Sequence, residues 1–87
     1  MYRILYQDAA GKFGIENAGN PEQMERSAFD IASSTSIIIC IYDYHHKKPL
    51  FTCSGYEKYW NTVNELVYEN KQVAKVTIEL SVSLVCR

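Results

Sequence analysis

The chain has 87 residues, of which 47% are apolar and 22% are charged, and its formal net charge is −1. This length accommodates one small domain, residues 1–87, and the composition is typical of a folded globular protein and excludes a disordered tail. Proteins that grip a phosphate backbone usually carry a basic excess, so the balanced charge argues against nucleic acid as the partner.

The sequence also predicts the compartment. The longest dense apolar run, Ile37 to Tyr42, has six residues, well short of the roughly 18 that cross a bilayer. The first residues alternate like a strand and show no signal-peptide core. The chain has three cysteines, whereas a secreted domain of this size usually needs two or more disulfides. We therefore expect a cytoplasmic protein with free thiols and no membrane association.

The first third of the chain predicts a hairpin followed by a helix. Apolar and polar residues alternate over 2–17, and Asp8 to Gly11 form the expected turn. Asn20 is a suitable N-cap, Pro21 suits the first helical position, and Gln23 stands where a capping partner belongs. The small polar residues after Ala32 predict that this helix ends near residue 33.

A second hairpin follows. The segment 37–42 is apolar and β-branched on both faces, which is typical of a central strand covered above and below. His45 to Lys48 form the predicted loop, and residues 50–53 form the returning strand. This pairing places Tyr44 opposite Pro49 and Cys40 opposite Cys53.

The next segment predicts an amphipathic helix that ends near Asn70. Ser54 and Glu57 have capping-box spacing. Helical spacing places six apolar residues on one stripe: Tyr56, Tyr59, Trp60, Val63, Leu66 and Val67. We therefore expect Trp60 to be buried.

The last segment, 75–86, alternates regularly and predicts a long strand that bends or runs past the edge of its sheet. The element order is then β-β-α-β-β-α-β. We predict a single α+β domain, with a mainly antiparallel sheet and two helices on one face.

This arrangement would leave one sheet face without helices. That face is covered either by side chains of its own strands or by a protein partner, because large exposed apolar patches usually mark contact sites. The long final strand offers a second route, because an unpaired edge can pair with another chain. We therefore expect either another protein or a second copy as the partner, through the open face or the final strand.

Reactive constellations are not evident in the sequence. Cys40, Cys53 and Cys86 fall at strand positions, far from the histidines at the loop. They are interpreted as buried thiols, with a disulfide between the first two on oxidation, or a three-cysteine zinc site, as the alternatives. No phosphate-binding spacing is present, and Asp30 and Asp43 stand apart from other carboxylates. We expect no catalytic residues, no metal and no cofactor.

The function predicted from these features is a small, non-catalytic protein-interaction module, a regulator or inhibitor of a larger protein, of the kind that phages and other mobile elements encode. Its expected binding residues surround the second hairpin loop, where Tyr and Phe flank the one local concentration of positive charge: Tyr42, Tyr44, His45, His46, Lys47, Lys48 and Phe51. A nucleic-acid or nucleotide binder that uses Tyr44 to Lys48 is the first alternative. A small enzyme with its site at a dimer interface is the second.

Overall fold

The first two strands form the predicted hairpin. In the computed structural model, which describes residues 1–69, β1 (Tyr2–Gln7) pairs antiparallel with β2 (Phe13–Ala18). The Asp8 carboxylate accepts the backbone N–H groups of Ala10 and Lys12, each at 2.9 Å, and thereby holds the turn. Gly11 adopts a φ of 85°, which a residue without Cβ reaches at little cost.

Helix α1 (Pro21–Ser33) begins as the sequence predicts. The side chain of Asn20 accepts the backbone N–H of Gln23 at 2.9 Å, and the side chain of Gln23 accepts the backbone N–H of Gly19 at 3.0 Å. The first bond satisfies a donor that the helix itself leaves free at its start, and the second ties the residue before the N-cap to the first turn. The N-cap prediction is confirmed.

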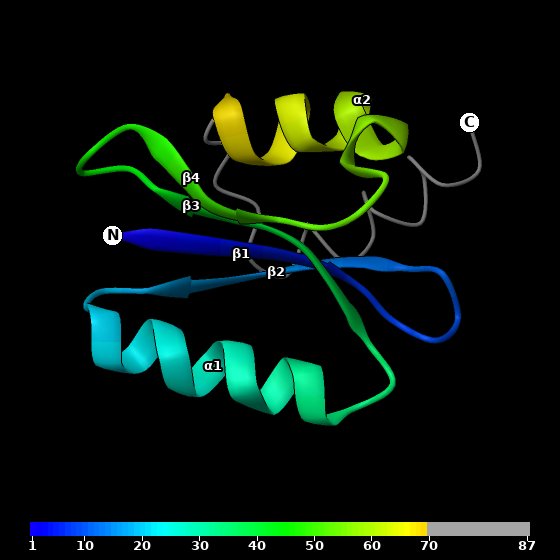
Figure 1. The fold of residues 1–87 in the computed structure, drawn as a ribbon, viewed down its shortest axis with the longest axis horizontal. Helices are drawn as coiled ribbons and strands as arrows, with labels where there is room; N and C mark the ends of the chain where they lie inside the picture. The colour runs from blue at the N-terminus through cyan, green and yellow to red at the C-terminus, as the bar shows by residue number, and fades with distance from the viewer. Residues whose placement is uncertain (70–87) are drawn as a thin grey trace.

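Strands β3 (Ile37–Asp43) and β4 (Lys48–Thr52) complete one sheet with the strand order β2-β1-β3-β4, in which every neighbouring pair is antiparallel. β3 occupies a central position, as its apolar character on both faces predicts. The α+β class with an antiparallel sheet is confirmed (Figure 1).

The second helical segment, Tyr56–Tyr68, is less regular than predicted. It consists of a 3-10 turn η1 (Tyr56–Tyr59), a single α turn α2 (Trp60–Val63) and a π turn η2 (Asn64–Tyr68). The predicted capping box at Ser54 and Glu57 is wrong. The cap position is occupied by Gly55, which has a φ of 76° and makes no side-chain capping bond, because glycine has no side chain to donate or accept.

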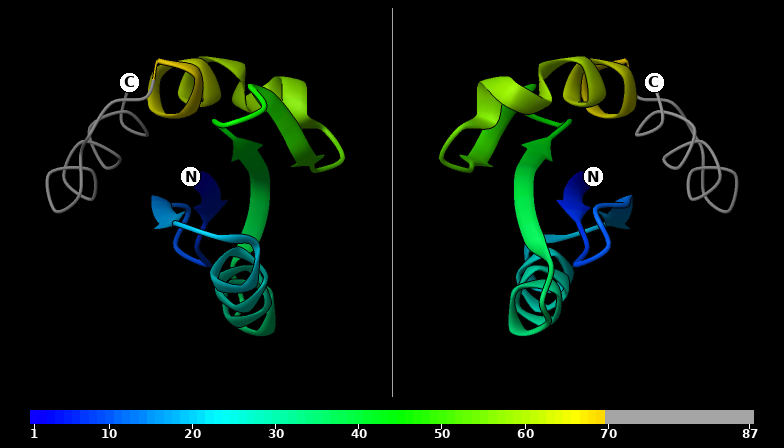
Figure 2. Two further views of the ribbon diagram at one scale, coloured as in Figure 1. Left: turned by 90° about the vertical axis from the view of Figure 1, so that its left-hand side faces the viewer. Right: turned by 90° about the vertical axis from the view of Figure 1, so that its right-hand side faces the viewer.

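The two helical segments lie on opposite faces of the sheet, so the prediction that both cover one face is wrong (Figures 1 and 2). Arg3 and Leu5 point toward the second segment, where Leu5 joins a buried core with Val63 and Leu66. Ile4 lies between them in the strand and therefore points the other way, toward α1. β3, apolar on both faces, thus receives a helical layer on each side.

Each face has its own buried residues. On the side of the second helical segment the core is formed by Leu5, Ile39, Cys40, Val63, Leu66 and Val67. On the side of α1 the buried apolar side chains are those of Ile4, Ala18 and Ile41. The strand predicted for residues 75–86, with Cys86, lies outside the described residues.

Candidate functional site

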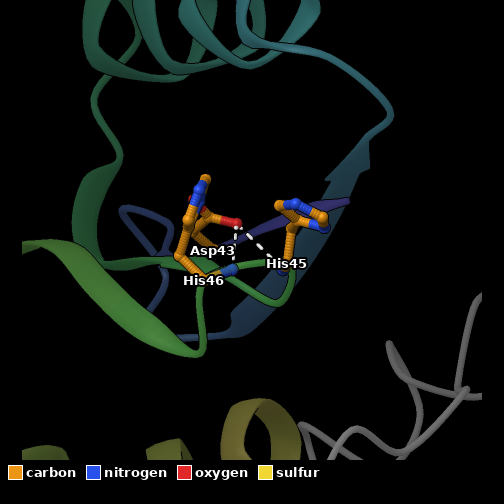
Figure 3. A network of polar contacts seen from close by, with 3 residues as sticks. All are labelled: Asp43, His45 and His46. Carbon is orange, nitrogen blue, oxygen red and sulfur yellow. Dashed lines mark hydrogen bonds and ion pairs between the residues drawn. The ribbon is translucent and has the colours of Figure 1, made fainter.

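The tip of the β3–β4 hairpin is built around Asp43. Its side chain is only 4% exposed, and it accepts the backbone N–H groups of His45 at 2.9 Å and His46 at 3.2 Å (Figure 3). Nδ1 of His46 lies 2.6 Å from Oδ2 of Asp43. Because an ionised carboxylate only accepts, this imidazole nitrogen is the donor.

These bonds have an electrostatic consequence. The hydrogen bond from the His46 side chain, assisted by the two backbone bonds, holds the pKa of the Asp43 carboxyl below its ordinary value. Asp43 therefore stays ionised and fixes the turn, in which Lys47 adopts a left-handed φ of 54°. Sequence reasoning did not pair Asp43 with a histidine, although an Asp three residues before a His in a predicted loop is compatible with such a turn.

Two of the predicted binding residues face inward. Tyr42 and Tyr44 are half-buried, with ring centroids 4.8 Å apart, and the ring of Tyr42 packs edge-on against Tyr68 at 5.2 Å. The Tyr44 hydroxyl donates to the backbone carbonyl of Val67. Burial raises the pKa of Tyr44. Both rings thus attach the second helical segment to the sheet and are largely withdrawn from a partner.

The other predicted residues are exposed. They belong to a continuous run, His45 to Thr52, in which every residue is exposed; we call it the hairpin surface. Leu50 and Phe51 are 45% and 46% exposed, which is high for large apolar side chains. Two lysines supply positive charge, and no Asp or Glu occurs between Tyr44 and Tyr56. Sequence reasoning missed Pro49, Leu50 and Thr52 as members of this surface.

The strand pairing differs from the prediction. Pro49 lies opposite Tyr42, and Cys40 lies opposite Thr52 instead of Cys53. The loop begins one residue earlier than predicted, and the register shifts between Ile41 and Tyr42, where β4 contributes one extra residue.

The two described cysteines are free thiols. Cys40 is fully buried, and burial raises its pKa to about 11. A thiol with so high a pKa is a poor nucleophile and a poor metal ligand at neutral pH. Cys40 is therefore a core residue.

The outer edge of β4 carries three features that discourage pairing with another strand. Pro49 has no N–H to donate, Lys48 places a charge on the edge, and the register shift disrupts the regular backbone pattern. The backbone of this edge is therefore poorly suited to pairing with another strand.

The most exposed large apolar side chain within residues 1–69 lies on α1. Phe29 is 72% exposed, and none of the thirteen residues of this helix is fully buried. Glu22 and Glu25 precede Phe29 by seven and four positions, so these three side chains project from neighbouring parts of the outer face.

Across residues 1–69, no helix has the length and apolar character that crossing a membrane requires. Within the same range, no three or more His, Cys, Asp or Glu side chains are arranged to hold a metal ion. Comparison of the chain with protein-family models, with curated proteins and with solved structures finds no match.

Proposed function

We propose that this chain is a small protein-interaction module that binds a protein through the hairpin surface, as a regulator or inhibitor of a larger protein would. The observation that supports the proposal most is the uninterrupted exposure of His45 to Thr52, including two large apolar side chains. Exposed apolar side chains beside lysines resemble a binding patch, with an apolar centre that is desolvated on contact and a charged rim.

The rigidity of the hairpin tip supports the same proposal. Asp43 fixes the turn through three hydrogen bonds, and Tyr42 and Tyr44 attach the base of the hairpin to the second helical segment. A surface that is held in place loses little conformational entropy on binding. The partner surface that fits this one combines apolar side chains with acidic residues.

The nucleic-acid alternative receives less support. It required Tyr44 as a stacking platform for a base, and this ring is packed against Tyr42 and tied to Val67. Two lysines alone release few counterions and would give weak binding to a phosphate backbone.

Site-specific photo-crosslinking tests the proposal. Phe51 is replaced by p-benzoylphenylalanine, and the chain is irradiated in a nuclease-treated lysate of its native host. The matched control carries the same photo-reactive residue at Lys12, which is exposed and lies between β1 and β2. The turn between these strands is at the end of the sheet opposite the β3–β4 tip (Figure 1). We expect a discrete protein adduct from position 51 and none from position 12. Absence of an adduct, or equal adducts from both positions, would contradict the proposal.

A further inference from the structure

The α1 side of the sheet is wider than the helix that covers it. Four strands spaced ~4.8 Å apart make a sheet about 19 Å wide, whereas a helix is about 10 Å across. Helix α1 packs against β1, β2 and β3, and all five residues of β4 are exposed. One helix therefore leaves room for a second beside it.

Phe51 lies on the part of this sheet face that no helix within residues 1–69 covers. It is directly opposite Ile41, which in turn is opposite Ile4, and directly opposed residues in antiparallel strands point to the same face. Ile4 points toward α1, so Phe51 faces the same side as α1, beyond the strands on which this helix packs.

We propose that a second copy of this chain supplies the missing helix, so that α1 of each copy packs over β4 of the other about a two-fold axis. The proposal rests on the proposed function, because it names a second copy as a partner of the hairpin surface. The contact is reciprocal, as a two-fold interface requires, and it buries the most exposed face of α1.

The two surfaces are complementary in charge and in apolar character. Helix α1 contains three acidic residues (Glu22, Glu25 and Asp30) and one basic residue, Arg26. The hairpin surface contains two lysines and no acidic residue. Each surface also presents one exposed phenylalanine, Phe29 on the helix and Phe51 on the strand. Such complementarity favours this pairing over contact between like surfaces.

The spacing of these groups also matches. Four helical residues separate Glu25 from Phe29, which corresponds to ~6 Å at ~1.5 Å per residue. Lys48 and Phe51 lie opposite Asp43 and Ile41, which are two strand residues apart because β4 contributes one extra residue here. This separation corresponds to ~6.6 Å at ~3.3 Å per residue. α1 and β4 run in the same direction (Figure 1). If the two-fold axis is parallel to them, α1 of one copy also runs in the same direction as β4 of the other. Lys48 can then meet Glu25 of the second copy while Phe51 meets its Phe29.

Sedimentation equilibrium of the full chain over a wide concentration range tests this proposal. We expect a monomer–dimer equilibrium that Phe51→Glu and Phe29→Glu each shift strongly toward monomer. Ile37→Glu is the matched control, because Ile37 is also exposed but lies opposite Gln7, on the other face of the sheet. This variant should dimerise as the natural sequence does. Circular dichroism establishes that each variant is folded.

A charge exchange provides a second test that leaves the apolar groups intact. Lys48→Glu and Glu25→Lys should each weaken the dimer by about tenfold, and both changes in one chain should restore it. A chain that is monomeric at every concentration, or a dimer indifferent to the changes at Phe29 and Phe51, would overturn the proposal. If the chain is monomeric but position 51 still forms an adduct with a different protein, a second copy is not the partner. The proposed function is then still supported.

Discussion

The guanidinium of Arg3 donates to the backbone carbonyl of Leu66 at 2.8 Å, across 63 positions of sequence, and both residues are buried. Nε of Arg3 also donates to the side chain of Asn17 at 2.8 Å, and the Tyr44 ring lies 5.7 Å from the guanidinium carbon. The Arg3 side chain thus connects β1 with β2 and with the second helical segment. It also contacts the ring of Tyr44, which lies at the base of the β3–β4 hairpin.

We expect Arg3→Lys to lower the free energy of unfolding by about 1–3 kcal/mol, because an ammonium cannot reproduce the planar arrangement of donors. Denaturation in urea measures this loss. Arg26→Lys on the exposed face of α1 is the matched control and should change stability by less than about 0.5 kcal/mol. Equal effects of the two substitutions would show that the buried bonds of Arg3 contribute little.

Gly14 is expected to be intolerant of a side chain. A Cβ atom at this position would lie 2.4 Å from Cζ of Tyr6, whose ring covers the glycine. Gly14→Ala should therefore destabilise the chain by about 1–3 kcal/mol, as overpacking generally does. Tyr6→Leu removes the clashing ring, so the double variant should lose less stability than the two single losses combined. Gly19→Ala, whose nearest contact is at 3.5 Å, serves as the control in the same thermal unfolding series.

The hairpin tip should make stability depend on pH in the acid range. Because the pKa of Asp43 is lower in the folded state, the unfolded chain takes up this proton first as the pH falls. The stabilisation that ionised Asp43 contributes is complete above the ordinary carboxyl pKa of about 4. It is lost as the pH falls through the lower pKa that Asp43 has in the folded state. Asp43→Asn should flatten the fall of Tm in this range, whereas Asp30→Asn on α1 should not. An unchanged slope in the Asp43 variant would contradict this account.

Trp60 is 50% exposed, which corrects the prediction that it is buried on the apolar stripe. We therefore expect Trp60→Ala to cost about 1–2 kcal/mol, less than the ~3–5 kcal/mol typical of a buried tryptophan. Leu66→Ala at a fully buried position should cost about 2–5 kcal/mol in the same denaturant series. Trp60 is the one tryptophan of the chain, so its emission maximum reports this exposure directly. Emission typical of an apolar interior would contradict it.

Local signals in the sequence predicted much of the fold. Alternation indicated β1 and β2, side-chain capping indicated the start of α1, and the apolar character of residues 37–42 indicated a central strand. That last feature also implied cover on both faces. Which face of the sheet each helix covers was not predictable. Alternation shows that a strand has two faces, but it does not say which helix packs on which face.

The candidate site was less predictable because it depends on register and helical period. The extra residue in β4 shifted the pairing of β4 with β3. The loop begins one residue earlier than expected, so that it includes Tyr44, whose hydroxyl reaches the carbonyl of Val67. In the second helical segment, the change from a 3-10 turn to a π turn moved Trp60 off the buried stripe. Composition alone distinguishes none of these alternatives.

The most direct test of the central claim, that the hairpin surface binds a protein, is a comparison of affinities. The protein captured from position 51 is purified and titrated calorimetrically with the natural chain and with a Lys47→Ala, Phe51→Ala double variant. We predict that the double variant binds at least about tenfold more weakly while its Tm stays close to that of the natural chain, because both side chains are exposed. Unchanged affinity in this variant would contradict the claim.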